Sequence, residues 1–220
     1  MLAEELIVDN IPPLQKSDTG ETALQWMDEF KITHLSVVDQ GNFLGTISES
    51  DVLGMSDLSE SMNDYLDLLN PAFVTQSQHI FEVVKVVNDQ KLTIIPVLDS
   101  QEQYVGSITI AQLMEIIADM PVANNPGGVI VIEMNINDYS LEMIARTIEE
   151  NNTKILGTFV TSHPESTKME LTIKVNKTDI TSVINALQRH GFNITFFEDR
   201  GDAEDDLRDR FDSFMNYLNI

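Results

Sequence analysis

The sequence predicts an α+β protein with two domains, a duplicated βαββα unit followed by a βαββαβ unit. Three observations lead to this prediction. A segment of strands and helix starts is written twice. A stretch with two prolines, two asparagines and two glycines, residues 121–128, interrupts the chain. Beyond it, apolar runs and helical spacings alternate in a different order. We therefore expect domains over residues 1–122 and 127–199, and an acidic amphipathic helix over residues 200–220.

The duplicated segment consists of a Val- or Ile-rich strand, a turn, a second strand and the start of a helix. In the first copy the strands lie at residues 35–39 and 43–48, and in the second at 95–99 and 104–109. Several residues recur at the same place in both copies: Lys31, Thr33, Val37, Asp39, Gly45 and Ile47 return as Lys91, Thr93, Val97, Asp99, Gly106 and Ile108. The agreement indicates an internal repeat, with repeats at about residues 1–56 and 71–120.

Each copy places a hydroxyl residue where its second strand gives way to a helix. Ser48 is followed three residues later by Asp51, and Thr109 by Gln112. Taken alone, this spacing is typical of a capping box, in which the hydroxyl oxygen accepts from the helix N-terminus and the later side chain reaches back.

The duplicated unit with its Gly-x-Ile-[Ser/Thr]-x-x-Asp element resembles the CBS domain, which occurs in tandem pairs. The resemblance implies a cleft between the repeats that binds an adenosine-containing ligand such as AMP, ADP, ATP or S-adenosylmethionine. It also implies that Ser48 lies near the phosphate and that Asp51 accepts hydrogen bonds from the ribose hydroxyls. Gln112 replaces the acid in the second copy, so we expect one intact site. The residues that the resemblance places around the ligand are Ser48, Asp51, His34, Leu35, Ser36, Ile95, Pro96 and Thr109.

The remaining elements of the first domain follow from local patterns. The prolines at residues 12 and 13 predict an extended segment or an edge strand before the first helix. The spacing of apolar residues over 17–30 predicts a helix in which Trp26 packs in the core or at an interface rather than against a ligand. The pattern of residues 57–70 predicts a linking helix that ends before Pro71. Residues 80–88 and 112–119 predict the two helices of the second repeat. Pro96 predicts that its strand is an edge strand or begins there.

In the second domain, the sequence pattern predicts strands at residues 129–134, 154–162, 168–175 and 193–197. Helices are expected at residues 140–151, capped by Ser140, and 179–190, capped by Thr178 or Asp179 and closed by Gly191. This βαββαβ order is ferredoxin-like, and the unit resembles an ACT domain. Its first turn, residues 135–140, has no glycine, which favours pairing with a second copy over amino-acid binding. The whole layout resembles acetoin-utilisation-type CBS–ACT proteins.

Beyond this domain, the tail carries an acidic cluster followed by Leu207, Phe211, Phe214 and Leu218 at helical spacing. This apolar stripe needs a surface to cover it, either on its own chain or on a second subunit.

Composition excludes several functional classes. The formal charge of −23 disfavours binding to nucleic acid and to anionic membranes. It also favours a ligand of modest charge, since lysines are scattered. No cysteine is present, so disulfides and thiolate chemistry are excluded. The four histidines are far apart, and no catalytic or cofactor motif occurs, so we expect neither an enzyme nor a metal site.

The sequence thus predicts a cytoplasmic regulatory protein without a cofactor, and with an adenosine compound as its ligand. We expect a homodimer in which the ligand biases the arrangement of the subunits. The alternative is a ligand-free dimerisation or interaction scaffold.

Overall fold

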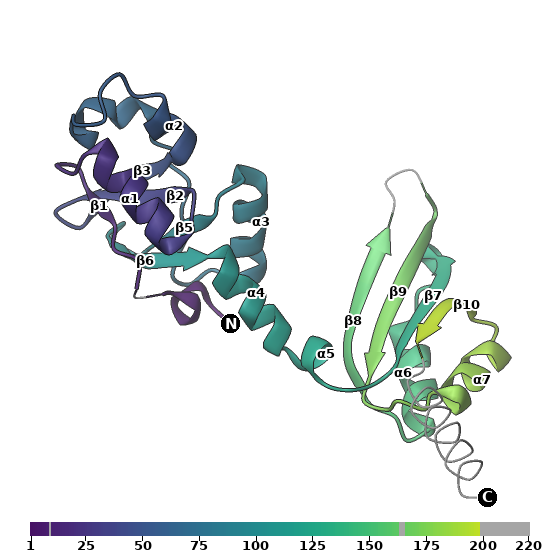
Figure 1. Cartoon of the computed structure of the whole chain (residues 1–220). Coiled ribbons are helices and arrows are strands. Elements are labelled where there is room, and N and C mark those ends of the chain that lie inside the picture. The colour runs from purple at the N-terminus through teal and green to yellow at the C-terminus, as the bar shows by residue number, and fades with distance from the viewer. Residues whose placement is uncertain (9, 163–165, 199–220) are drawn as a thin grey trace, which may run out of the picture. The chain divides into compact units, whose positions relative to one another are not determined.

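The computed structural model describes residues 1–8, 10–162 and 166–198. These residues fall into two compact units, one over Met1–Ile117 and one that begins at Ala118 (Figure 1). The predicted helix over residues 200–220 lies outside the described residues, as does most of the turn after residue 162.

The first unit contains two sheets of the same topology, each with three strands. In each sheet a two-residue strand runs parallel to the central strand, and the third strand is antiparallel to it. The first repeat consists of β1 (Leu14–Gln15), α1 (Gly20–Phe30), β2 (His34–Asp39), β3 (Asn42–Ser48) and α2 (Glu49–Leu53). The second consists of β4 (Val74–Thr75), α3 (Ile80–Gln90), β5 (Ile94–Leu98), β6 (Tyr104–Thr109) and α4 (Ile110–Asp119). The predicted duplication of a βαββα unit is confirmed.

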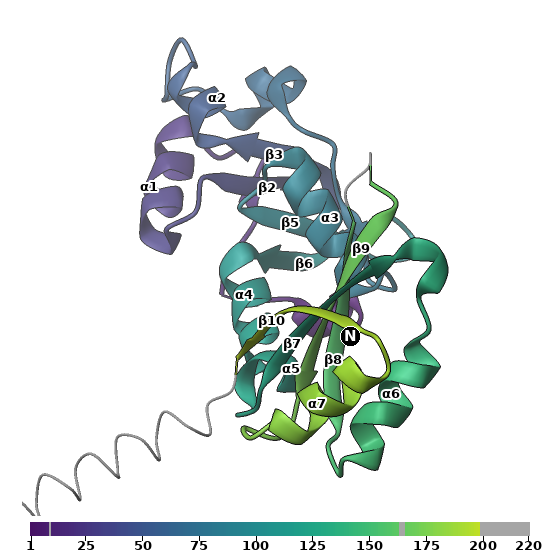
Figure 2. The ribbon, with the colours of Figure 1, turned by 90° about the vertical axis from the view of Figure 1, so that its right-hand side faces the viewer.

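The two repeats are joined by exchanged segments and by a shared core, in which β2 lies beside β5 (Figure 2). The backbone N–H of Val8, from the first repeat, donates to Ser107 O of β6 at 2.9 Å. In the other direction, the N–H of Thr46 on β3 donates to Asn70 O at 2.8 Å. Ile94 of the second repeat belongs to the buried cluster of the first. The pair therefore folds as one body.

Two glycines make these exchanges possible. A Cβ on Gly45 would lie 2.5 Å from Leu69 Cβ, and a Cβ on Gly106 would lie 2.4 Å from Ile7 Cγ2. Both glycines also have positive φ angles, 153° and 156°. Their recurrence in the two repeats therefore follows from the close passage of the exchanged segment over each sheet.

Two expectations for this unit are corrected. Pro96 lies inside the central strand β5 rather than at an edge, and it is tolerated because β4 pairs only with Val97 and Leu98. The stretch predicted as one linking helix is instead a 3₁₀ segment, η2 (Met62–Leu68), with a non-helical residue at Tyr65. As predicted, Trp26 packs against the core of the first repeat.

The second unit is one four-stranded antiparallel sheet with two helices on one face (Figure 1). Its strands are β7 (Val129–Asn135), β8 (Ile155–Ser162), β9 (Lys168–Val175) and β10 (Asn193–Glu198), and its helices are α6 (Leu141–Glu150) and α7 (Thr181–Arg189). The chain order is βαββαβ, as predicted, and the strand order is β10-β7-β9-β8. Alternate residues of β9, including Leu171 and Ile173, are buried beneath the helices.

Three local expectations for this unit had different outcomes. Ser140 makes no side-chain capping bond to α6, so the predicted cap is wrong. Asp179 Oδ1 accepts from the Thr181 N–H at 3.1 Å at the start of α7, and Gly191, with φ 83°, follows that helix as expected. Within residues 121–128, Pro121–Asn124 forms a short helix, α5, because proline is compatible with the first helical turn. Val122 of α5 packs on Gly157 of β8.

The face of this sheet opposite the helices carries a row of side chains that is mainly apolar. Phe196 pairs with Val131, Val131 with Thr172, and Thr172 with Phe159, so these residues of four neighbouring strands form one line. The two phenylalanines are more than half exposed. The row is therefore an apolar surface bordered by solvent.

Candidate ligand-binding site

The end of the first repeat places Ser48 and Asp51 in direct contact. Ser48 Oγ accepts from the Asp51 N–H at 3.1 Å and donates to Asp51 Oδ2 at 2.5 Å. Ser48 is thus the N-cap of α2. Its hydroxyl proton is held by the Asp51 carboxylate, which keeps its other oxygen available as an acceptor.

His34 lies beside this pair, because His34 and Ser48 are register partners on β2 and β3. The backbone N–H of Thr93 donates to His34 Nδ1 at 3.3 Å, so Nδ1 is the unprotonated nitrogen of the neutral ring. Burial lowers the pKa of His34, and the negative charge of Asp51 offsets part of this effect. Three of the residues expected around a ligand, His34, Ser48 and Asp51, are therefore grouped at the end of the first sheet.

The other residues expected to frame the ligand lie inside the central strands. Leu35, Ser36, Ile95 and Pro96 are buried. The hydroxyl of Ser36 is 3.0 Å from that of Ser107, which in turn is 2.9 Å from the Tyr104 hydroxyl. Burial raises the pKa of Tyr104, against the opposing effect of these hydrogen bonds. These groups therefore hold the two sheets together.

A cleft of about 650 Å³ opens at the end of the second sheet, within the 300–1,000 Å³ typical of small-molecule sites. It is lined by residues from both repeats: Val8, Asn10, Ile11, Phe30, Lys31, Ile32, Thr93, Thr109, Ile110, Ala111, Gln112 and Glu115. Of the expected site residues, Thr109 lines this cleft. Thr109 Oγ1 accepts from the Gln112 N–H at 3.0 Å, so it caps α4 as Ser48 caps α2.

Sequence reasoning missed several polar groups of this cleft, notably Asn10, Lys31, Thr93 and Glu115. The repeat offered a signal for two of them, because Lys31 and Thr93 both belong to the recurring positions. Lys31 ends α1 in a left-handed conformation with φ 55°, and Lys91 does the same after α3. No comparable sequence signal exists for Glu115. Its place in the cleft follows only from the structure, in which α4 borders the cleft.

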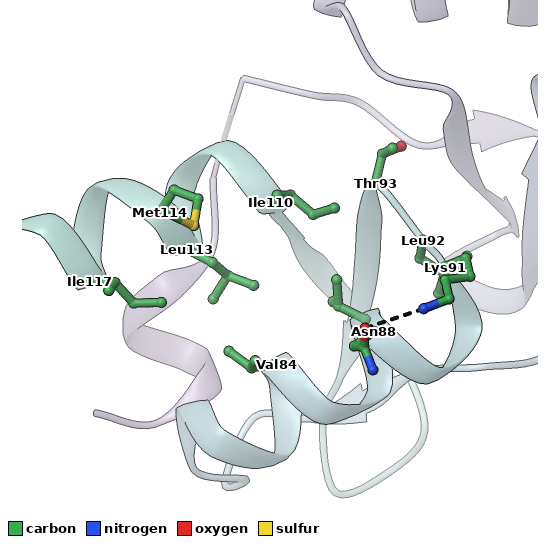
Figure 3. Close-up of a pocket in the computed structure, with 10 residues that line it drawn as sticks. Val84, Asn88, Lys91, Leu92, Thr93, Ile110, Leu113, Met114 and Ile117 are labelled. Atoms are coloured by element: carbon green, nitrogen blue, oxygen red, sulfur yellow. Dashed lines mark hydrogen bonds between the residues drawn. The ribbon is translucent and has the colours of Figure 1, made fainter. Parts of the chain in front are cut away.

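A second, apolar cavity of about 360 Å³ lies between α3 and α4 (Figure 3). Val84 on α3 faces Leu113, Met114 and Ile117 on α4, while Lys91 is turned toward Asn88 at one end. Met114 is 58% exposed, although it belongs to an apolar lining. This groove has the character of a contact surface for apolar side chains.

Two further features bear on function. Among residues 1–8, 10–162 and 166–198, no group of three or more histidine or acidic side chains is arranged to hold a metal ion. No helix in the same ranges is both long and apolar enough to cross a bilayer.

Several solved structures are similar to this chain. A CBS domain pair/ACT domain protein from Thermotoga maritima is 20% identical, with a TM-score of 0.48, over 54% of this chain and 98% of its own. CBSX2 in complex with AMP is 19% identical, with a TM-score of 0.46, over 53% and 95%. The cytosolic domain of the Mg²⁺ channel MgtE in complex with ATP is 22% identical, with a TM-score of 0.43, over 52% and 48%.

The family model of the CBS domain matches twice, at residues 3–57 and 62–119. The two matches correspond to the two βαββα repeats and together cover just over half of the chain. The chain therefore belongs to the CBS domain family and carries two CBS domains in tandem.

Proposed function

We propose that this protein is a cytoplasmic regulatory protein whose CBS pair binds an adenosine-containing metabolite between its repeats. The observation that carries the proposal is the cleft of about 650 Å³ in which residues of the first repeat face the capped end of α4. Its wall combines apolar surface, suited to a purine ring, with a small number of polar groups that fix orientation. AMP and ATP are the ligands bound to CBSX2 and to the MgtE domain.

In the first repeat, Asp51 is the acceptor proposed for a ribose diol, and Ser48 is the hydroxyl proposed near the phosphate. Because Ser48 already donates to Asp51, ligand binding there would exchange one hydrogen bond for others. His34 stands next to the pair with its Nδ1 occupied, so only its Nε2–H is available to a ligand. Backbone groups of Leu35, Ser36, Ile95 and Pro96 remain proposed neighbours of the base.

The balance of charge favours a ligand with few phosphates. Lys31 and Glu115 are the two charged residues among those that line the cleft, and the whole chain carries a formal charge of −23. A triphosphate would need more cationic groups or a metal ion. AMP or an S-adenosyl compound is therefore preferred over ATP.

We propose a homodimer as the state on which the ligand acts, because ligand changes an arrangement only by preferring one of two states. The groove of Val84, Met114 and Ile117 supplies a mainly apolar surface on the CBS pair. On the second unit, the order βαββαβ with strand order β10-β7-β9-β8 supports a ferredoxin-like, ACT-type domain. The exposed row of Phe159 and Phe196 gives that domain its own self-association surface.

A thermal-shift panel of AMP, ADP, ATP, S-adenosylmethionine and NADH tests the ligand. Saturation at a hundred times the Kd contributes about 2.7 kcal/mol, which raises the Tm by roughly 5–10 °C for a chain of this size. Asp51→Ala should reduce this rise, while the unliganded protein keeps the Ser48 cap and loses only the hydrogen bond from Ser48 to the Asp51 carboxylate, about 1 kcal/mol. A flat panel would favour the ligand-free scaffold.

Native mass spectrometry tests the assembly with two variants, Met114→Gln in the groove and Phe159→Gln on the open sheet face. Each removes an exposed apolar side chain without adding charge. We expect dimers of the wild-type chain and a larger monomer fraction for either variant. A wild-type chain that is monomeric with and without AMP would contradict the proposed assembly.

A further inference from the structure

Three side chains of the second repeat follow one another along the wall of the cleft. Thr109 precedes α4, and Gln112 and Glu115 occupy its first and second turns at intervals of three residues. Helical residues three apart lie on the same face, with Cβ atoms about 5–6 Å apart. The carboxylate of Glu115 therefore lies one turn beyond the amide of Gln112, on the same side of the cleft.

The hydrogen bonds of these groups differ from those of the first repeat. There, the Ser48 hydroxyl donates to Asp51. Thr109 Oγ1 accepts from the Gln112 N–H, but within the described part of the chain its proton has no acceptor. The side chains of Gln112 and Glu115 likewise form no hydrogen bond or ion pair with any other described residue. One free donor, one amide and one carboxylate thus converge on a cleft of ligand size.

We propose that the cleft of the second repeat is a working nucleoside site in which Glu115, with Gln112, holds the ribose diol. This inference rests on the proposed function. A carboxylate accepts from both hydroxyls of a diol. Glu115, one helical turn beyond Gln112, therefore takes the role of the acid that is missing at position 112. The free proton of Thr109 is then available to an acceptor oxygen of the phosphate or of the sugar.

Lys31 supplies the only cation of this cleft among the residues that line it. Its ion pair with Asp28 is 2.8 Å long, but both side chains are more than three-quarters exposed. Such a pair contributes little to stability, so Lys31 can turn to a phosphate at small cost. One cation opposite one carboxylate suits a nucleoside monophosphate better than a triphosphate.

The experiment uses the full chain with Asp51→Ala, so that the AMP binding that remains is that of the cleft of the second repeat. AMP and 2′-deoxy-AMP are titrated calorimetrically into this variant with and without Glu115→Gln. We expect Asp51→Ala to retain one AMP site, and Glu115→Gln to weaken it by roughly 10- to 100-fold, the loss of one hydrogen bond to a charged group. Removal of the 2′-hydroxyl should weaken binding similarly when Glu115 is present, and have little added effect when it is absent.

Two further variants sharpen the result. Glu82→Gln on the exposed face of α3 removes an acid outside the cleft and should leave AMP affinity unchanged. Adding Gln112→Asp to the Glu115→Gln protein restores an acid one turn away and should recover affinity and sensitivity to the 2′-hydroxyl.

The inference is overturned if Asp51→Ala alone abolishes AMP binding that the wild-type chain shows. It is also overturned if Glu115→Gln leaves the affinity for AMP unchanged. In the first case the proposed function stands with a single site at Asp51. In the second case it stands with a cleft that binds AMP without the help of Glu115. If the wild-type chain binds no adenosine compound, the proposed function itself fails.

Discussion

The two CBS repeats share one topology but differ in the side chains that occupy equivalent positions. Ser36 in the first repeat corresponds to Pro96 in the second, and Thr46 corresponds to Ser107. Ser36 and Ser107 form a buried hydroxyl pair. Because proline has no hydroxyl, the mirror pair is missing, and Thr46 Oγ1 is a buried oxygen without a hydrogen-bond partner in the described structure. The two repeats therefore share one backbone arrangement, but the hydroxyl pair occurs at only one of the two equivalent places.

The same comparison also distinguishes the ends of the two sheets. His34, Ser48 and Asp51 form a hydrogen-bonded or electrostatically coupled group in the first repeat. Their counterparts Ile94, Thr109 and Gln112 form a less polar group with a free hydroxyl proton. The two ends are therefore expected to differ in ligand preference and in response to pH.

The largest expected effect concerns the paired glycines. Gly45→Ala should lower the free energy of unfolding by about 3 kcal/mol, because the new Cβ meets Leu69 Cβ and the φ of 153° is unfavourable. Gly106→Ala should cost about half as much, since its contact is the γ-methyl of Ile7, which can move. Urea unfolding measures both changes, with Gly54→Ala, at φ −84°, as the control. Equal losses for Gly45 and Gly106 would contradict the difference between the two contacts.

The hydroxyl asymmetry predicts changes of opposite sign at corresponding positions. Ser107→Ala deprives Ser36 and Tyr104 of their shared partner and should lower stability by about 1–3 kcal/mol. Thr46→Val replaces a buried oxygen that has no partner, so it should raise stability by roughly 1 kcal/mol. Chemical denaturation of the two variants and the wild type measures the difference. Destabilisation by Thr46→Val would show that its oxygen is satisfied in solution.

The smallest effect is the pH dependence contributed by His34. Burial lowers its pKa in the folded chain below the ordinary value of about 6.5, so the unfolded chain binds the proton more readily. The free energy of unfolding should therefore fall as the pH drops below about 6.5 and toward the folded pKa. His34→Asn keeps an acceptor for the Thr93 N–H and should flatten this part of the curve. Parallel curves for the variant and the wild type would contradict the assignment.

The architecture could be predicted from the sequence because it depends on signals that recur. Gly45 and Gly106, the strand pairs and the capped helix starts at Ser48 and Thr109 each appear twice, so each copy supported the other. The position of Pro96 was mispredicted because the general rule for proline in sheets ignores how short β4 is. Ser140 has a ψ of 95° and makes no capping bond, whereas Ser48, which caps α2, has a ψ of 157°, and residue type does not determine this angle.

The site was predicted only in part, since its members come from segments that approach one another through the exchange between repeats. Ser48, Asp51 and His34 could be grouped because repeat logic places them at one sheet end. The cleft of the second repeat forms because Asn10 and Lys31 of the first repeat face α4. No local sequence pattern indicates this proximity. Glu115 carries no motif, and its role follows from the helix face it shares with Gln112.

Calorimetric titration of the wild-type chain with AMP and S-adenosylmethionine tests most directly whether the CBS pair is a ligand-binding module. We expect saturable binding of at least one of them, at up to two sites per chain, together with a raised Tm. The absence of saturable binding by both compounds, with an unchanged Tm, would contradict it and leave a protein whose CBS pair serves assembly alone.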